Sequence, residues 1–260
     1  MTSRRALRSA VATTFVAIRL QSCATEPRPS AKLTVAAATN LTDAFASVGR
    51  EFQKKTGIEV VFTYGSTAQL AQQINNGAPF DLFAAADTDH VDALVKDRKL
   101  DGDSRAVYAL GQLALWIPGG ERGVVRGLND LTSEKIRYIA IAQPELAPYG
   151  RASLDALKRQ GIWETVQSKV VYASSINMAK QMAATGNADA AFTAYSLVLH
   201  EQGVVVKVDP RFYSPIQQSL AIVSGSARTE EAQQLRAFLL GEEGLTILAK
   251  NGYLSPSAGR

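Results

Sequence analysis

The fold is decided by residues 33–48, LTVAAATNLTDAFASV, in which a strand pattern passes into a helix pattern. The first half is a short apolar run typical of a buried strand, and Leu41 and Phe45 then recur at the four-residue spacing of a helix face. Thr39 and Asn40 occupy the turn between them, and their side chains favour helix N-caps because their oxygens accept free amide hydrogens. If these amides and hydroxyls face a cleft instead, they form a neutral donor site at the positive end of a helix dipole, which suits an anion. This stretch alone leaves both interpretations open.

The same pattern of strand, turn and helix recurs along the chain. Turns of this kind hold Thr39 and Asn40, Ser66 and Thr67, Pro148 to Gly150, and Ser175 and Ile176. Such alternation predicts two doubly wound α/β lobes, whose ligands bind beyond the carboxyl ends of strands, where these turns lie. Apolar segments at 108–118 and 218–223 are candidates for strands that cross between the lobes. We therefore predict one lobe from residues 31–110 and 219–260, and a second lobe from residues 111–218.

The composition is that of a globular protein with balanced charge. Of 260 residues, 46% are apolar and 20% are charged, which is ordinary for a soluble chain with a sizeable core. The net charge of +4 comes from residues 1–22, which hold four of the 28 basic residues and no acidic one, so that 24 basic residues remain against 24 acidic ones. The mature chain therefore lacks the basic excess with which proteins neutralise nucleic-acid phosphates.

Residues 1–22 are typical of an export signal, because early arginines precede an apolar stretch that is too short to span a bilayer. The motif LQSC at residues 20–23 resembles a lipobox, in which the cysteine is acylated and becomes the new N-terminus. SRRALR at residues 3–8 weakly resembles a twin-arginine signal, so the export route stays open. Cys23 is the only cysteine, which excludes disulfides within the chain and cysteine-based metal sites. We predict a periplasmic or cell-envelope protein, lipidated at Cys23, with a tether at residues 23–30.

The four turns share a chemical property, since none of them contains Lys, Arg or His. A neutral, fixed set of donors can hold a fully ionised oxyanion and discriminate by size, whereas a lysine would attract any anion. His90 and His200 are isolated and are interpreted as surface residues, not as metal ligands. Asp87 and Asp89 follow a strand and are interpreted as cap and turn residues. Ser66 has no evident base partner for nucleophilic catalysis, so we expect neither an enzyme nor a cofactor.

From about residue 33 to residue 253, the chain resembles the periplasmic molybdate-binding proteins of ABC importers. The segments that carry the resemblance occur in order: AAATNLTDAF, YGSTAQLAQQI followed by NNGAPFDLFAAAD, APYGRASLDALKRQG and ATGNADAAF. The resemblance implies a type II periplasmic binding protein, with two α/β lobes joined by crossing strands and a cleft between them. It also implies a tetrahedral oxyanion ligand, molybdate or tungstate, held by hydroxyls and main-chain amides.

By position, the resemblance places the ligand contacts at Thr39, Asn40, Thr67, Tyr149 and Ile176. It also adds Ser66, which stands directly before Thr67. These residues would contact the oxyanion through hydrogen bonds and would not be direct ligands of the metal atom. Other members place alanine at Tyr149, and Ile176 would contribute its amide. Some members add a tyrosine hydroxyl after the ATGNADAAF segment; the count gives Ala194, and the neighbouring Tyr195 is kept as a further candidate.

The resemblance implies an exported, monomeric binding protein that delivers molybdate or tungstate to the permease of an ABC transporter. It implies no nucleic-acid partner, and no membrane contact beyond a lipid anchor. Three alternatives stay open: a binding protein for sulfate, phosphate or thiosulfate, an enzyme on the same two-lobed fold, and the sensing domain of a regulator. A size series of anions separates the first, because sulfate is smaller than molybdate. An enzyme would need a general base or nucleophile in the cleft, and a regulator would need a DNA-binding segment.

Overall fold

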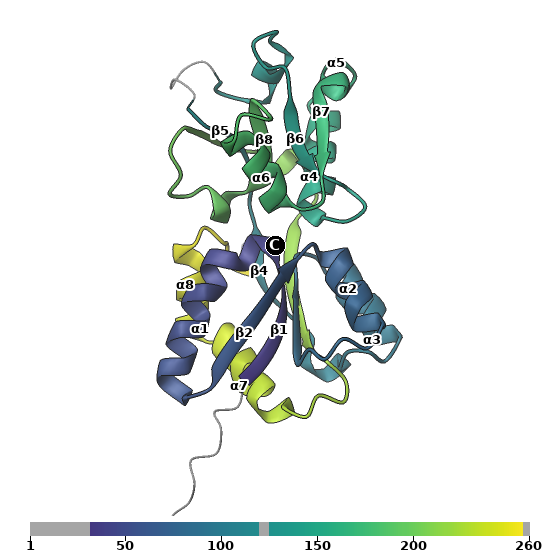
Figure 1. Ribbon diagram of the computed structural model, residues 1–260, viewed down its shortest axis with the longest axis vertical. Coiled ribbons are helices and arrows are strands. Elements are labelled where there is room, and N and C mark those ends of the chain that lie inside the picture. The colour runs from purple at the N-terminus through teal and green to yellow at the C-terminus, as the bar shows by residue number, and fades with distance from the viewer. Residues whose placement is uncertain (1–31, 120–124, 257–260) are drawn as a thin grey trace, which may run out of the picture.

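The computed structural model of the chain describes residues 32–119 and 125–256. They form two α/β lobes that lie one above the other along the long axis, with lobe 1 at the bottom of Figure 1. Each lobe is built on a five-stranded sheet, with the order β2-β1-β3-β10-β4 in lobe 1 and β7-β6-β8-β5-β9 in lobe 2. The predicted two-lobed α/β fold is therefore confirmed.

The strands of lobe 1 are β1 (Lys32–Ala38), β2 (Glu59–Gly65), β3 (Leu82–Ala85), β4 (Ala106–Gly111) and β10 (Ile216–Ile222). Those of lobe 2 are β5 (Leu113–Ile117), β6 (Ile139–Ala142), β7 (Val170–Ala173), β8 (Ala190–Ala194) and β9 (Val204–Lys207). In lobe 1, β1 pairs in parallel with β2 and β3, and in lobe 2, β6 pairs in parallel with β7 and β8. The remaining pairs, made by β10 and β5, are antiparallel.

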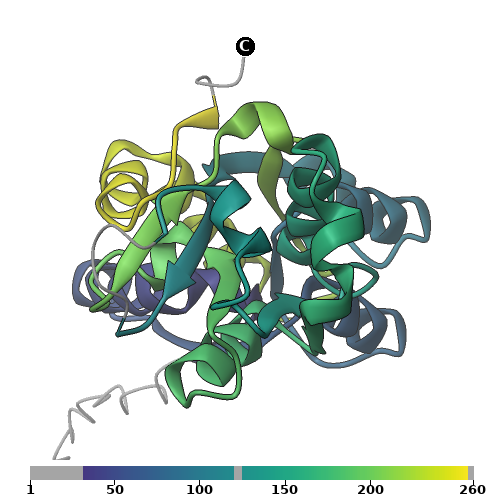
Figure 2. The ribbon, with the colours of Figure 1, turned by 90° about the horizontal axis from the view of Figure 1, so that it is seen from above.

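Helices cover both faces of the sheets, as the view from above shows (Figure 2). Those of lobe 1 are α1 (Thr42–Thr56), α2 (Thr67–Asn75), α3 (Asp89–Lys96), α7 (Thr229–Leu240) and α8 (Glu242–Lys250), and those of lobe 2 are α4 (Pro148–Arg159), α5 (Trp163–Val166) and α6 (Ile176–Ala184). Short 3-10 helices η1 (Thr39–Leu41), η2 (Gly102–Ser104), η3 (Leu128–Thr132), η4 (Gln167–Lys169), η5 (Tyr195–Leu197) and η6 (Pro210–Phe212) complete the described elements. None of the helices in the described ranges is long and apolar enough to cross a membrane.

The central strand β1 explains why lobe 1 needs helices on both faces. Val35 belongs to the same apolar cluster as Phe45 and Phe52 of α1, whereas Ala36 belongs to a second cluster with Leu70 of α2. Successive residues of a strand point to opposite faces, so a strand buried on both faces reads as a continuous apolar run. Phe45 and Phe52 are at most 1% exposed, and burying such a side chain contributes roughly 1.5–3 kcal/mol.

Two segments connect the lobes and together form the hinge: the passage from β4 to β5 around Gly111, and the passage into β10 around Gln218. The apolar segment that we predicted at 108–118 is two strands, because β4 ends at Gly111 in one sheet and β5 begins at Leu113 in the other. The chain returns through β10, which begins at Ile216, ahead of the lobe boundary that we placed at 219. The predicted export signal, the tether and Cys23 lie outside the described residues.

Candidate functional site

The four turns singled out in the sequence lie at the carboxyl ends of parallel strands, on the side where the lobes meet. The last residues of β1 and β2, Ala38 and Gly65, are partners in register, and each is followed directly by a candidate turn. A hydrogen bond joins the lobes at this point, since the N–H of Ala68 in α2 donates to the carbonyl of Leu146 before α4 at 3.3 Å. The 3-10 helix η1 of lobe 1 also packs against α6 and η5 of lobe 2. The fold therefore brings donors from both lobes to one place.

Asn40 is held in place by the hinge, not by capping. Its side-chain Nδ2 donates to Gln218 Oε1 at 2.7 Å and to Tyr253 Oη at 2.9 Å. Its carbonyl oxygen accepts from Tyr253 Oη at 2.6 Å and from Ser196 Oγ of lobe 2 at 2.9 Å. Both side-chain N–H groups are thus engaged, which leaves the backbone amide as the donor that Asn40 can offer a ligand. The half-buried hydroxyl of Thr39 makes no hydrogen bond within the described ranges and remains available.

These partners of Asn40 were not predicted from the sequence. Gln218, Tyr253 and Ser196 lie 156 to 213 residues away along the chain. Local periodicity carries no signal for pairs so far apart. The one available hint was that Gln218 begins the segment proposed as a crossing strand.

At the second turn, two hydroxyls are buried without acting as caps. Ser66 occupies the N-cap position of α2, but its side chain makes no capping bond. It is 3% exposed, and its Oγ has no hydrogen-bond partner in the part of the chain that the structure describes. Thr67 Oγ1 accepts from the N–H of Ala86 at 3.2 Å, which leaves its hydrogen free to donate. A buried polar atom without a partner calls for an explanation, and a ligand bound at the start of α2 supplies one.

Tyr149 and Ile176 offer backbone amides from lobe 2. Tyr149 follows Pro148 in the first turn of α4, and Ile176 is the first residue of α6, so neither N–H has an acceptor within its helix. Both residues are buried, at 2% and 3% exposure. The turn of α4 lies tightly on β6, because a Cβ at Gly150 would come 2.1 Å from the carbonyl oxygen of Ala142. Capping is the correct interpretation only for Ser175, whose Oγ accepts from Met178 N at 3.2 Å.

The side chain of Tyr195 is engaged elsewhere. Lys207 Nζ lies 4.8 Å from the centre of its ring, and the ring also contacts the backbone at Gly252. Tyr195 begins η5, and the strand position before it is Ala194, which has no hydroxyl. We therefore remove Tyr195 from the candidate set.

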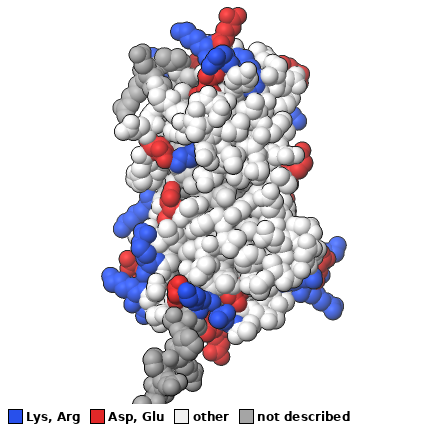
Figure 3. Space-filling model, in the orientation of Figure 1, with Lys and Arg blue, Asp and Glu red and all other residues white. Residues whose placement is uncertain are grey.

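The site itself is electrically neutral. Burial raises the pKa of Tyr149 well above its ordinary value, the phenols of Tyr253 and Tyr213 add to the rise, and the nearby Asn40 amide opposes it. Tyr149 therefore stays an uncharged phenol. On the face shown in Figure 3, charged side chains gather mainly at the ends and rims of the molecule, and the middle of the face is largely uncharged. An anion held here would be bound by oriented dipoles.

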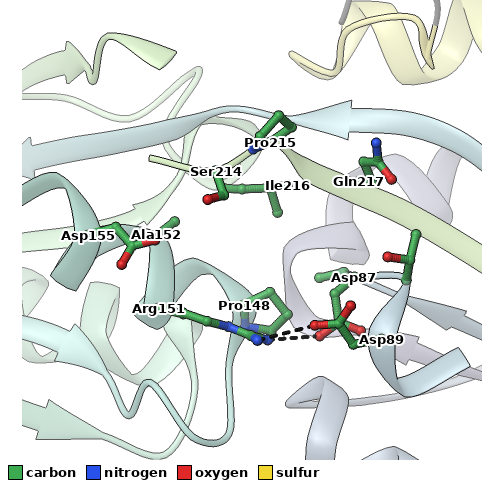
Figure 4. Close-up of a pocket in the computed structure, with 12 residues that line it drawn as sticks. Asp87, Asp89, Pro148, Arg151, Ala152, Asp155, Ser214, Pro215, Ile216 and Gln217 are labelled. Atoms are coloured by element: carbon green, nitrogen blue, oxygen red, sulfur yellow. Dashed lines mark hydrogen bonds and ion pairs between the residues drawn. The ribbon is translucent and has the colours of Figure 1, made fainter. Parts of the chain in front are cut away.

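Charged residues do bridge the lobes beside the site. Arg151 of α4 contacts Asp87 and Asp89 of lobe 1, with Nη2 to Asp87 Oδ2 and Nη1 to Asp89 Oδ2 both at 3.3 Å (Figure 4). These residues line a cavity of about 280 Å³ together with Pro148 and Ser214. The sequence interpretation missed this bridge, because Arg151 lies 64 residues from Asp87.

Asp87 and His90 combine an expected contact with an unexpected one. Asp87 Oδ1 accepts from the N–H of His90 at 3.2 Å, as expected for a cap. Asp87 Oδ2 also lies 2.8 Å from His90 Nδ1, and this hydrogen bond raises the pKa of His90. His90 is therefore paired with Asp87 and partly buried, a contact that the interpretation as a surface histidine did not include.

The chain is similar in sequence to known proteins. The family model for bacterial extracellular solute-binding proteins matches residues 33–254. The chain is 33% identical over 230 residues to the molybdate-binding protein ModA of Rhodobacter capsulatus, covering 88% of this chain and 90% of that protein. It is 34% identical over 242 residues to ModA of Azotobacter vinelandii, covering 90% and 93%.

The chain is also similar to solved structures of binding proteins. The periplasmic molybdate-binding protein of Azotobacter vinelandii superposes with a TM-score of 0.83 at 30% identity, covering 86% of this chain and 99% of that chain. The sulfate-binding protein SubI of Mycobacterium tuberculosis H37Rv, at 18% identity and a TM-score of 0.76, shares the fold over 88% of each chain. The chain belongs to the family of bacterial extracellular solute-binding proteins.

Proposed function

We propose that this chain is an extracytoplasmic substrate-binding protein that captures molybdate or tungstate and delivers it to the permease of an ABC transporter. The observation that carries the proposal is the buried hydroxyl of Ser66, which has no partner among the described residues and lies at the start of α2 beside the hydroxyl of Thr67. Relatives of 33% and 34% identity that are molybdate-binding proteins support the choice of ligand.

Binding requires donors from both lobes. Thr39, the Asn40 amide and Thr67 belong to lobe 1, and the amides of Tyr149 and Ile176 belong to lobe 2. An open cleft admits the dianion, and closure surrounds it with donors and excludes water. Hydrogen bonds to a charged group contribute about 1.5–3 kcal/mol each, more than those between neutral groups. Because the donors are fixed in position and uncharged, the cleft selects by size and by hydrogen-bond count.

The same geometry favours a binding protein over an enzyme. Ser66 has no hydrogen-bonded base within the described ranges, and a nucleophilic serine needs one. We propose that the protein carries out no catalysis, needs no cofactor and acts as a monomer. An exported location, with lipidation at Cys23, completes the proposal and rests on the N-terminal sequence.

Isothermal titration calorimetry on residues 24–260 tests the function. Titration with molybdate, tungstate, sulfate and phosphate should show one-to-one binding of the first two anions and no binding of the others. Ser66→Ala should weaken molybdate binding, because it removes a donor. The matched control is Ser224→Ala, which changes an exposed serine beyond β10, in the loop before α7. Tight binding of sulfate or phosphate, or equal affinities for the two variants, would contradict the proposal.

A further inference from the structure

The side chain of Tyr149 reaches from lobe 2 to the strands that connect the lobes. A Cβ added to Gly111 would lie 2.0 Å from Tyr149 Oη and 2.9 Å from Tyr149 Cζ. Gly111 is the last residue of β4, directly before the chain crosses into lobe 2. The same added atom would lie 2.9 Å from Nε2 of Gln218 in β10, the returning strand. The tip of the phenol therefore rests where the two crossing strands lie side by side.

The contact between Tyr149 and Gly111 is steric. Tyr149 is 2% exposed, and its Oη makes no hydrogen bond with any described residue. Protein interiors are packed as densely as organic crystals, so a side chain in such a place moves only if its neighbours move. A side chain at position 111 would overlap the phenol, so the ring or the strand would have to shift to admit it.

The contact between Tyr149 and Gly111 lies between candidate ligand donors of opposite lobes. The amide of Tyr149 itself is a candidate donor, and the first turn of α4 has little freedom because Gly150 lies against the carbonyl of Ala142. On the other side, Gln218 Oε1 accepts from Asn40 Nδ2 at 2.7 Å, which ties the phenol's neighbour to the donor turn of lobe 1. A displacement at the hinge therefore changes the separation between the lobe 1 and lobe 2 donors.

We propose that the Tyr149 ring is a positioning element whose contact with Gly111 stops lobe closure at a fixed separation and so sets the size of oxyanion that the closed cleft accepts. This inference rests on the proposed function and adds to it the residue pair that determines size selectivity. The ring acts through the hinge, whereas the amide of the same residue acts on the ligand.

A double-mutant cycle with Gly111→Ala and Tyr149→Ala tests the stop, read by calorimetry with molybdate and with sulfate. Gly111→Ala should weaken molybdate binding at least tenfold, because its methyl group displaces the phenol and the cleft cannot close. Tyr149→Ala should lower the ratio of molybdate to sulfate affinity. The double variant should recover most of the affinity lost in Gly111→Ala, because removing the phenol removes the closest clash and leaves only the approach to Gln218 Nε2 at 2.9 Å.

The matched control is Gly127→Ala, since Gly127 has an extended backbone with φ of −166° and an added Cβ meets nothing within 4 Å. It should bind like the wild type. Thermal unfolding of every variant separates loss of folding from loss of closure. The lowered ratio of molybdate to sulfate affinity in Tyr149→Ala distinguishes a stop from a general packing role, and an unchanged ratio refutes the stop. If the wild type binds molybdate and the two substitutions combine additively, the stop is refuted and the binding function stands. If the wild type binds neither anion, both proposals fall.

Discussion

The bridge from Arg151 to Asp87 and Asp89 predicts a variant that loses affinity without losing stability. Arg151 belongs to α4 of lobe 2, and both aspartates belong to lobe 1, so these contacts exist only when the lobes are together. Replacing Arg151 with Gln removes the charge while each lobe keeps its own core. The closed form should therefore be weakened, and the free energy of unfolding of the separate lobes should not change.

The expected loss of affinity in Arg151→Gln follows from the solvent exposure of the paired side chains. At 3.3 Å and an effective dielectric constant of 20, Coulomb attraction is about 5 kcal/mol. Desolvation and side-chain ordering cancel most of this, and measured exposed pairs contribute about 0.2–1 kcal/mol. The Asp87 side chain is 11% exposed and the Asp89 side chain 71%, so Asp87 supplies most of the net effect. A net contribution of about 1 kcal/mol corresponds to roughly a fivefold loss of affinity.

Calorimetry with molybdate and stopped-flow measurement of ligand release test whether Arg151 stabilises the closed form. Arg151→Gln should bind about fivefold more weakly and release the ligand faster, and added salt should reduce the difference from the wild type. The control is Arg105→Gln, because Arg105 pairs with Asp92 within lobe 1. Unchanged affinity in Arg151→Gln, or an equal loss in both variants, would refute the cross-lobe role.

Three further predictions concern single residues. Thr67→Ala should lower molybdate affinity without unfolding the protein, because it removes a buried donor; calorimetry that shows the wild-type affinity would reject Thr67 as a contact. The hydrogen bond that His90 donates to Asp87 raises the folded-state pKa of His90, Asp89 adds to the rise, and burial and Arg151 oppose it. Its contribution to stability is therefore complete below the unfolded-state pKa of about 6.5 and is lost as the pH rises through the raised folded-state value. Thermal unfolding between pH 5 and pH 8 should show this loss in the wild type and not in His90→Gln; identical pH profiles would count against the pair. Gly150→Ala should destabilise the fold by about 1–3 kcal/mol, because the added Cβ would come 2.1 Å from the Ala142 carbonyl, and a urea midpoint equal to that of the wild type would contradict this packing.

The local pattern of the sequence was enough to predict the first strand and the first helix, the four candidate turns and their order. The spacing of Leu41 and Phe45 predicted α1, and the apolar run before Thr39 predicted β1, because both patterns are set by residues close together in the chain. The contacts that shape the cleft were beyond such reasoning. The bridge from Asp87 to Arg151 joins residues far apart in the sequence, and no period connects them. Nor does any pattern show that the phenol of Tyr149 rests on Gly111.

The choice between capping and ligand binding is decided helix by helix. Among the described helices that begin at the candidate turns, α6 has a side-chain cap, from Ser175, whereas Ser66 stands at the equivalent position of α2 and does not cap it. The first turn of α4 follows Ala147, which has no capping group. A side-chain cap contributes about 1 kcal/mol of stability. A hydrogen bond from the Ser66 side chain would stabilise α2 in this way, and a capping residue in place of Ala147 would stabilise α4. Apart from the N–H of Ala68, which donates to Leu146, the uncapped amides of these first turns lie at the meeting point of the lobes, which is where an oxyanion would need them. Sites that break a local rule of stability are where function is expected, because selection preserves stability only down to the level that function requires.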